Sequence, residues 1–246
     1  SGMYTLPLSV KQNKEGKPVV WAATLSGSYA RLNNKNMTEY INPDEVLNAG
    51  LNLSHRRPIS KRWSMIATLG GGVYAAPNEI TTKSILVNGG VIFVYQVKDN
   101  LDLGVGAGLT NSFGVPIVMP MLMVNWRLSG KYEVNVDVAN CFQVSAATKF
   151  GNRFKLKLVA IEMDGISSVM DVNGKSMIYA SASIGSYLAP EYRIGKSSTL
   201  YMGIGGNWER SVTLTRRTLK DFFKNAFNNK RELHFGPTGY VSMGFR

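Results

Sequence analysis

The chain has 246 residues, 44% of them hydrophobic, and its 28 Lys and Arg residues against 16 Asp and Glu residues give a net charge of +12. This composition is that of one or two folded domains and excludes an intrinsically disordered chain. A single cysteine, Cys141, excludes an intramolecular disulfide, and with only two histidines beside it a Cys/His zinc cluster cannot form. We therefore expect no metal and no cofactor.

The first residues predict no structure of their own. Ser1-Gly2-Met3 is typical of a cloning remnant, and no basic segment followed by an apolar one comes after it. We expect that an export signal has been removed. We interpret residues 1–17 as an N-terminal extension and residues 18–246 as a single domain.

Alternation of apolar with small or polar residues dominates the rest of the chain. In Leu101–Leu109 every odd position is apolar and every even one is Asp or Gly, a period of two that is typical of a β-strand. Similar segments predict twelve strands at 18–31, 45–55, 63–75, 84–97, 101–110, 117–128, 132–138, 142–150, 154–163, 177–194, 199–210 and 234–246.

The connections between these strands alternate in length. Short polar turns are expected at 55–62, 98–100, 129–131, 151–153 and 195–198. Longer connections are expected between them, at 33–44, 76–83, 111–116, 139–141, 164–175 and 211–233. This pattern is typical of an outer-membrane barrel, with short turns in the periplasm and longer loops outside. It predicts an all-β, antiparallel, up-and-down transmembrane β-barrel of about 12 strands.

Aromatic residues on the apolar face support this prediction. They cluster near the strand ends, as in the two girdles that a barrel places at the lipid interfaces, where a ring can bury its apolar body and keep its polar tip in water. The predicted girdle residues are Trp21, Trp63, Tyr95, Trp126, Tyr132 and Trp208. The competing interpretation is that these are scattered surface aromatics.

Several segments resemble a family of uncharacterised outer-membrane β-barrels of Gram-negative bacteria, a domain-of-unknown-function family. They are 101–109, 113–116 with Pro120, 124–128, 192–195 and 239–246. The resemblance implies an outer-membrane location and a barrel, with no established activity. The last strand also looks like the C-terminal signal of barrel-assembly machinery, although Arg246 follows the final aromatic, Phe245.

Charged residues on the inner face form a predicted cluster. Pairing strands across short turns brings Arg127 opposite Glu133 and Lys149 near Lys155. The full predicted cluster is Arg127, Glu133, Asp137, Lys149, Lys155 and Lys157. One interpretation is a salt-bridge network that closes a narrow barrel, and the other is a selectivity ring for anionic solutes.

The longest connection is strongly basic. We expect a short helix after Thr218, with Leu219, Phe222, Phe223, Ala226 and Phe227 at near-helical spacing. Its basic residues are Arg216, Arg217, Lys220, Lys224, Lys230 and Arg231. Two interpretations stay open: the helix binds lipopolysaccharide phosphates, or its aromatic face covers the barrel mouth.

No catalytic pattern is complete. The Gly-Lys-Ser strings at 174–176 and 195–197 lack the earlier glycine of a phosphate loop, and no serine is singled out beside His234 and Glu209. We expect neither an enzyme nor a nucleic-acid-binding protein. The sequence predicts a narrow pore, or a structural or binding component of a Gram-negative outer membrane, in contact with its lipid, lipopolysaccharide and assembly machinery. The alternatives are a soluble, lipocalin-like barrel for an apolar ligand and an outer-membrane lipid-modifying enzyme.

Overall fold

The structure, a computed structural model, describes residues 2–32, 43–111, 113–128, 131–137, 142–195, 198–227 and 233–245. Fourteen strands form one antiparallel sheet. The strands are β1 (Gly2–Gln12), β2 (Pro18–Arg31), β3 (Glu45–Pro58), β4 (Trp63–Ala75), β5 (Ile85–Lys98), β6 (Leu101–Thr110), β7 (Ile117–Leu128), β8 (Tyr132–Asp137), β9 (Phe142–Phe150), β10 (Phe154–Val172), β11 (Lys175–Ile194), β12 (Ser198–Arg216), β13 (Leu233–Phe235) and β14 (Thr238–Phe245). Two helical segments complete the fold: η1 (Thr82–Ser84) and α1 (Leu219–Phe227).

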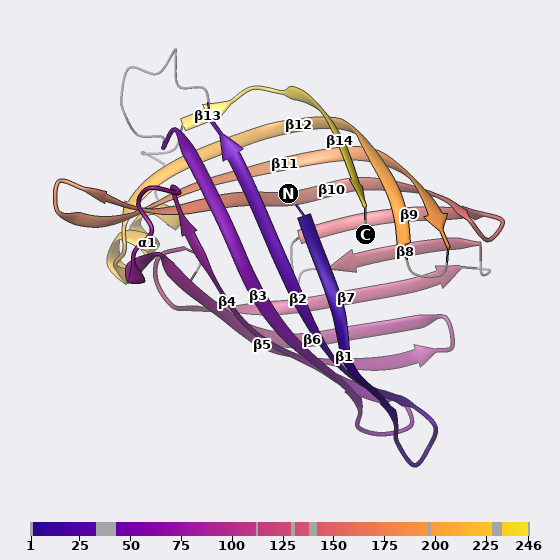
Figure 1. Cartoon of the computed structure of the whole chain (residues 1–246). Coiled ribbons are helices and arrows are strands. Elements are labelled where there is room, and N and C mark those ends of the chain that lie inside the picture. The colour runs from indigo at the N-terminus through magenta and orange to yellow at the C-terminus, as the bar shows by residue number, and fades with distance from the viewer. Residues whose placement is uncertain are drawn as a thin grey trace.

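The topology is up-and-down. Each strand from β1 to β12 pairs with its neighbours in the chain, and β13 and β14 both pair with β12 as two pieces of one final strand. The predicted all-β antiparallel architecture is therefore confirmed. The sheet is strongly curved but not closed, and Figure 1 shows β1 and β14 in front of β8 and β9.

The first strand was not predicted. Gly2–Gln12 belong to the sheet and are not an extension, because they pair with β2 from Gly2 opposite Gly27 to Gln12 opposite Pro18. Pro7 lies beside a bulge in this strand. An edge strand tolerates proline, since it needs hydrogen bonds on one side only. The alternation of Tyr4, Leu6 and Leu8 is thus a strand signal that Pro7 obscures.

The hairpin of β10 and β11 is another difference from the prediction, besides the extension of β12 to Arg216 and the division of the predicted last strand into β13 and β14. Residues 164–175 are not a loop, because strand pairing continues to Val172 opposite Lys175. Asn173 and Gly174 make the turn with φ values of 54° and 73°. Positive φ at both positions is the requirement of the two-residue Asn-Gly hairpin turn. Figure 1 shows this hairpin extending beyond the neighbouring strands, near α1.

Contacts between strands that are not neighbours identify the inner face of the sheet. Tyr179 of β11 is fully buried and packs with Val46 of β3 and Val212 of β12. Ile178 of β11 packs with Leu86 of β5. Since β3 and β5 are far from β11 in strand order, the sheet must curl around these side chains. The side chains on the same face as Val46 and Leu86 therefore point inward.

Glycines on the inner face allow close approach of neighbouring strands. A Cβ atom at Gly106 would lie 2.0 Å from the carbonyl oxygen of Val91, and one at Gly72 would lie 2.4 Å from that of Ala49. Backbone atoms cannot move aside as side chains can, so these positions require glycine.

Gly106→Ala is therefore predicted to destabilise the fold by about 1–3 kcal/mol, the usual cost of overpacking. Gly27→Ala is the matched control, because a Cβ there would meet nothing nearer than the Asn48 carbonyl oxygen at 3.9 Å. Denaturant midpoints in neutral detergent, followed by tryptophan fluorescence, measure both variants. Equal midpoints would contradict the strand-contact argument.

Candidate functional site

The outward face of the sheet carries large, exposed apolar side chains. The exposed fraction is 69% for Leu69, 70% for Val118 and 74% for Val241. Such side chains lie on strands from one edge of the sheet to the other: Leu6, Leu25, Leu51, Leu53, Val87, Phe93, Val105, Leu122, Leu158, Leu188, Ile204 and Val241. A water-soluble monomer rarely exposes a continuous apolar patch of this extent. This face must be covered by something apolar.

Five of the six predicted girdle residues are exposed on this face: Trp21, Trp63, Trp126, Tyr132 and Trp208. Tyr95 is half-buried because its ring lies 4.9 Å from that of Trp63, its partner in the strand register. Except for Trp208, these residues lie toward the short-turn ends of their strands. Three further exposed aromatics lie at the same end and were missed: Phe150, Phe154 and Tyr192.

The predicted register of the charged cluster is confirmed on four strands. Arg127 pairs with Glu133, and Lys149 pairs with Lys155. Glu133 contacts both lysines, at 2.5 Å to Lys149 Nζ and 2.6 Å to Lys155 Nζ. We call these three residues the Glu133 bridge. It ties β8, β9 and β10 together on the inner face.

The rest of the predicted cluster divides into two other groups. Arg127 does not bind Glu133, since its guanidinium donates to Asp102 of β6 at 2.9 Å and to the carbonyl oxygen of Asp99 at 3.0 Å. Lys157 donates to Gln143 Oε1 at 2.8 Å, and Gln143 donates to Glu162 at 2.8 Å. Asp137 is opposite Gln143 in the register. The charges are therefore matched locally, as in a structural network.

Asp102, Gln143 and Glu162 are the members of this network that the sequence did not indicate. Asp102 lies on β6, which a longer connection separates from β7, so its register with Arg127 cannot be read from a short turn. The bulge between Val159 and Glu162 hides Glu162, because it reverses the alternation of faces along β10. Gln143 has no formal charge and was overlooked for that reason.

The hairpin core, formed by Val46, Leu86, Val169, Ile178, Tyr179 and Val212, fills the loop-side end of the sheet. Ser168 pairs with Tyr179 and Val169 with Ile178, so successive pairs face opposite sides of the hairpin. All four residues are buried. Both faces of the hairpin are therefore covered at this level, by side chains that include Val46 of β3 and Leu86 of β5.

A half-buried arginine fixes the segment before α1. Arg217 donates to the carbonyl oxygens of Gly114, at 3.1 Å, and of Lys83, at 2.7 Å. Burial lowers the pKa of this guanidinium. Gly114 has φ +83°, and a Cβ there would collide with Ile178 and Arg217. The connections before β5, β7 and α1 are thus held against the hairpin core.

The predicted helix after Thr218 is present as α1. The Thr218 hydroxyl accepts a hydrogen bond from the Asp221 amide at 3.1 Å, as an N-cap residue does. The Phe222 ring lies 5.8 Å from that of Phe113, whereas Leu219 and Phe223 are exposed. Phe222 therefore packs on the adjacent loop, while Leu219 and Phe223 remain accessible on the surface of α1. Lys230 and Arg231 lie outside the described residues.

Neither a metal site nor a membrane-spanning helix is formed by the part of the chain that the structure describes. Its residues bring no three His, Cys, Asp or Glu side chains together where a metal ion could bind. Across the same ranges, no helix combines the length and apolarity needed to cross a membrane. His234 lies opposite Ser211 in the register of β12 and β13.

Glu133→Gln is predicted to destabilise the fold by about 1–3 kcal/mol, because Lys149 and Lys155 would then be directly opposed without a carboxylate between them. In the Glu133→Gln background, Lys149→Gln should restore part of this loss by removing the repulsion. Unfolding midpoints of the two single variants and the double variant measure the coupling. Strictly additive effects would contradict the role of the Glu133 bridge.

The comparisons with known proteins identify a family without assigning a role. A search of curated proteins gives no match, and a search of solved structures gives none either. The whole chain, residues 1–246, matches the family described as Domain of unknown function (DUF6268). The chain therefore belongs to the DUF6268 family.

Proposed function

We propose that this protein is an outer-membrane β-barrel of a Gram-negative bacterium, closed on its loop side, that acts as a structural or binding component. The observation that carries the proposal is the exposed apolar face, continuous over the outward side of the curved sheet. A lipid bilayer is the environment in which such a face is stable. The exposed aromatic residues at the short-turn ends form a band, which we call the aromatic band. Its members are Trp21, Trp63, Trp126, Tyr132, Phe150, Phe154 and Tyr192. This band supports the same environment, because amphipathic rings favour the lipid interface.

The distribution of side chains opposes the soluble alternative. A lipocalin-like barrel would place its apolar face inward, around a ligand. Here Val105 and Leu200 are exposed, whereas Lys155 and Lys157 share a face with Val159, which is fully buried. The interior carries the ion pairs, as expected where the outside contacts lipid.

Closure of the sheet completes the proposed barrel. Among the described residues, β1 pairs on one edge only, with β2, and β14 pairs only with β12. An open edge inside a bilayer would leave backbone groups without hydrogen bonds, each at a cost of several kcal/mol. We propose that β1 and β14 pair in the membrane. The antiparallel order gives these two strands the same direction, so the closing pair is parallel.

The loop side is proposed to face the cell exterior. Longer connections lie on that side in outer-membrane barrels. The exposed Lys220 and Lys224 of α1, beside the exposed Leu219 and Phe223, present cations and apolar side chains together. This combination suits the phosphates and acyl chains of lipopolysaccharide. Barrel-assembly machinery is the expected partner during insertion.

Leu25→Arg is predicted to impair membrane insertion, whereas Ser26→Arg is tolerated. Leu25 is 57% exposed on the outward face of β2, and Ser26 points inward. An arginine on the lipid face near mid-membrane costs about 2–4 kcal/mol. The chain is expressed behind an export signal, and its gel mobility in the membrane fraction is compared with and without boiling.

Wild type and Ser26→Arg should show a heat-dependent shift in the membrane fraction, and Leu25→Arg should show less folded protein there. A protein that stays soluble with no shift, or two arginine variants with equal effects, would contradict the proposed lipid-facing barrel.

We also propose that the hairpin core obstructs the interior of the barrel, which predicts a protein with little conductance. In planar bilayers we expect no steady channels from wild type, and discrete conductance steps after residues 166–181 are replaced by Asn-Gly, which removes the hairpin core. Tyr179→Ala is the milder variant, with an expected cost of about 3–5 kcal/mol and transient openings. Large stable wild-type channels would contradict the closed barrel and favour the narrow pore.

A further inference from the structure

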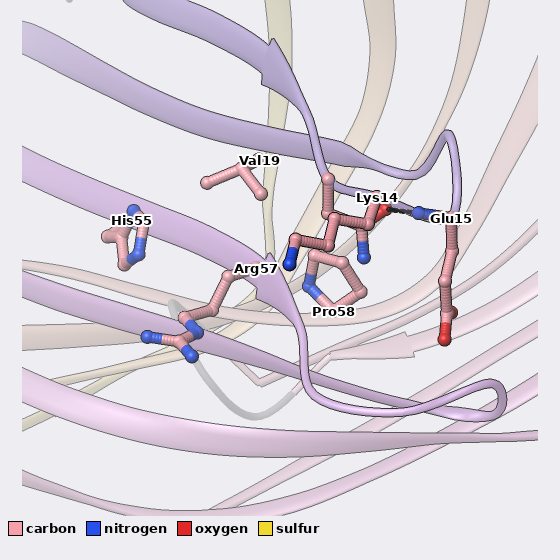
Figure 2. A pocket seen from close by; sticks show the side chains of 7 residues that line it. Lys14, Glu15, Val19, His55, Arg57 and Pro58 are labelled. Atoms are coloured by element: carbon pink, nitrogen blue, oxygen red, sulfur yellow. Dashed lines mark hydrogen bonds between the residues drawn. The ribbon is translucent and has the colours of Figure 1, made fainter.

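We propose that a pocket at the short-turn end of the sheet binds the phosphate of an anionic phospholipid. This inference rests on the proposed membrane location and adds a ligand to it. The pocket has a volume of ≈ 360 Å³ and is lined by Asn13, Lys14, Glu15, Val19, His55, Arg57 and Pro58. Figure 2 shows Lys14, His55 and Arg57 around Val19, with the Glu15 carboxylate extending away from them.

The turn that carries Lys14 is rigid. Asn13 Oδ1 accepts hydrogen bonds from the amides of Glu15, at 3.0 Å, and of Lys17, at 2.9 Å. Lys17 Nζ in turn donates to the carbonyl oxygens of Ser60, at 3.1 Å, and of Lys61. The turn between β1 and β2 is therefore fastened to the turn between β3 and β4. The pocket between them is preorganised and does not depend on a ligand for its shape.

The pocket has an uncompensated positive charge. Within the described ranges, neither Lys14 nor Arg57 has an ion-pair partner, and the nearby Glu15 carboxylate lies 4.0 Å from Lys17 instead. His55 Nδ1 is buried and has no hydrogen-bond partner among the described residues. The Lys14 and Arg57 cations thus line, beside the His55 ring, a space that a phosphate group could enter. Arginine and lysine are the usual partners of phosphate oxygens.

The position of the pocket selects a lipid as the source of that phosphate. His55 and Arg57 are on the outward face of β3, the same face that carries the exposed Leu51 and Leu53. The Trp21 ring stacks on His55 with centroids 4.1 Å apart. Trp21 belongs to the aromatic band, which the proposed orientation places at the lipid interface. A phospholipid there can put its phosphate in the pocket while its acyl chains follow the apolar strands.

The experiment uses the full chain in neutral-detergent micelles. Dioleoyl phosphatidylglycerol or dioleoyl phosphatidylcholine is added in small amounts, and the lipid retained on the folded protein is measured by native mass spectrometry. Wild type should retain phosphatidylglycerol at about tenfold lower lipid than phosphatidylcholine, and Lys14→Gln and Arg57→Gln should each weaken retention about fivefold.

Arg56→Gln is the matched control, because Arg56 is adjacent in sequence but points to the other face of β3 and does not line the pocket. It should retain phosphatidylglycerol as wild type does. Equal losses in Arg56→Gln and Arg57→Gln, or no loss in Arg57→Gln, would overturn the proposal. So would displacement of the lipid by millimolar inorganic phosphate, which would assign the pocket to a free anion.

Heat-dependent gel mobility of the same variants separates this proposal from the proposed function. If folding and insertion are normal but the lipid preference is absent, the pocket assignment fails and the barrel stands. If the heat-dependent shift is absent in wild type, the barrel itself fails, whatever lipid the protein retains.

Discussion

Antiparallel pairing of successive strands is the constraint on which the rest of the structure depends. Because side chains alternate between the two faces of a sheet, the register between neighbours decides at once which side chains face outward and which meet inside. The pairs of Arg127 with Glu133 and of Lys149 with Lys155 follow from this register, and so does the exposed position of Trp126 and Tyr132. A slip of one residue would put charge on the apolar face.

The short turns made much of this register readable from the sequence. Strands 18–31, 63–75, 101–110, 117–128 and 142–150 were predicted with the bounds that the structure has. Where two strands are joined by few residues, each partner follows from counting outward from the turn. Longer connections give no such count, which is why Asp102 was not expected beside Arg127. The bulge in β10 likewise changed the face of Glu162 without any signal in the pattern.

Two errors in the strand prediction, at β1 and at the β10–β11 hairpin, have local causes. Pro7 obscured β1, although the edge of a sheet accommodates it, and the Asn173-Gly174 turn was read as part of a loop, although that dipeptide favours a tight hairpin. The error at the hairpin mattered more for function, because the extended hairpin brings Ile178 and Tyr179 against inward-facing side chains of β3 and β5. The basic pocket had no sequence signal either, since Lys14 and Arg57 are 43 positions apart and meet only because two turns are fastened together.

The hairpin core also sets an order of events during folding. Every strand pair of the sheet joins segments that follow one another along the chain, apart from the split final strand, and hairpins of this kind form within microseconds when isolated. Contacts of Tyr179 with Val46 span more than half of the polypeptide and require loop closure over that whole distance. We therefore expect neighbouring strands to pair one after another, and Tyr179 to become buried only after that pairing. The fluorescence of a tryptophan placed at that position would mark the final step of assembly, separately from the growth of the sheet.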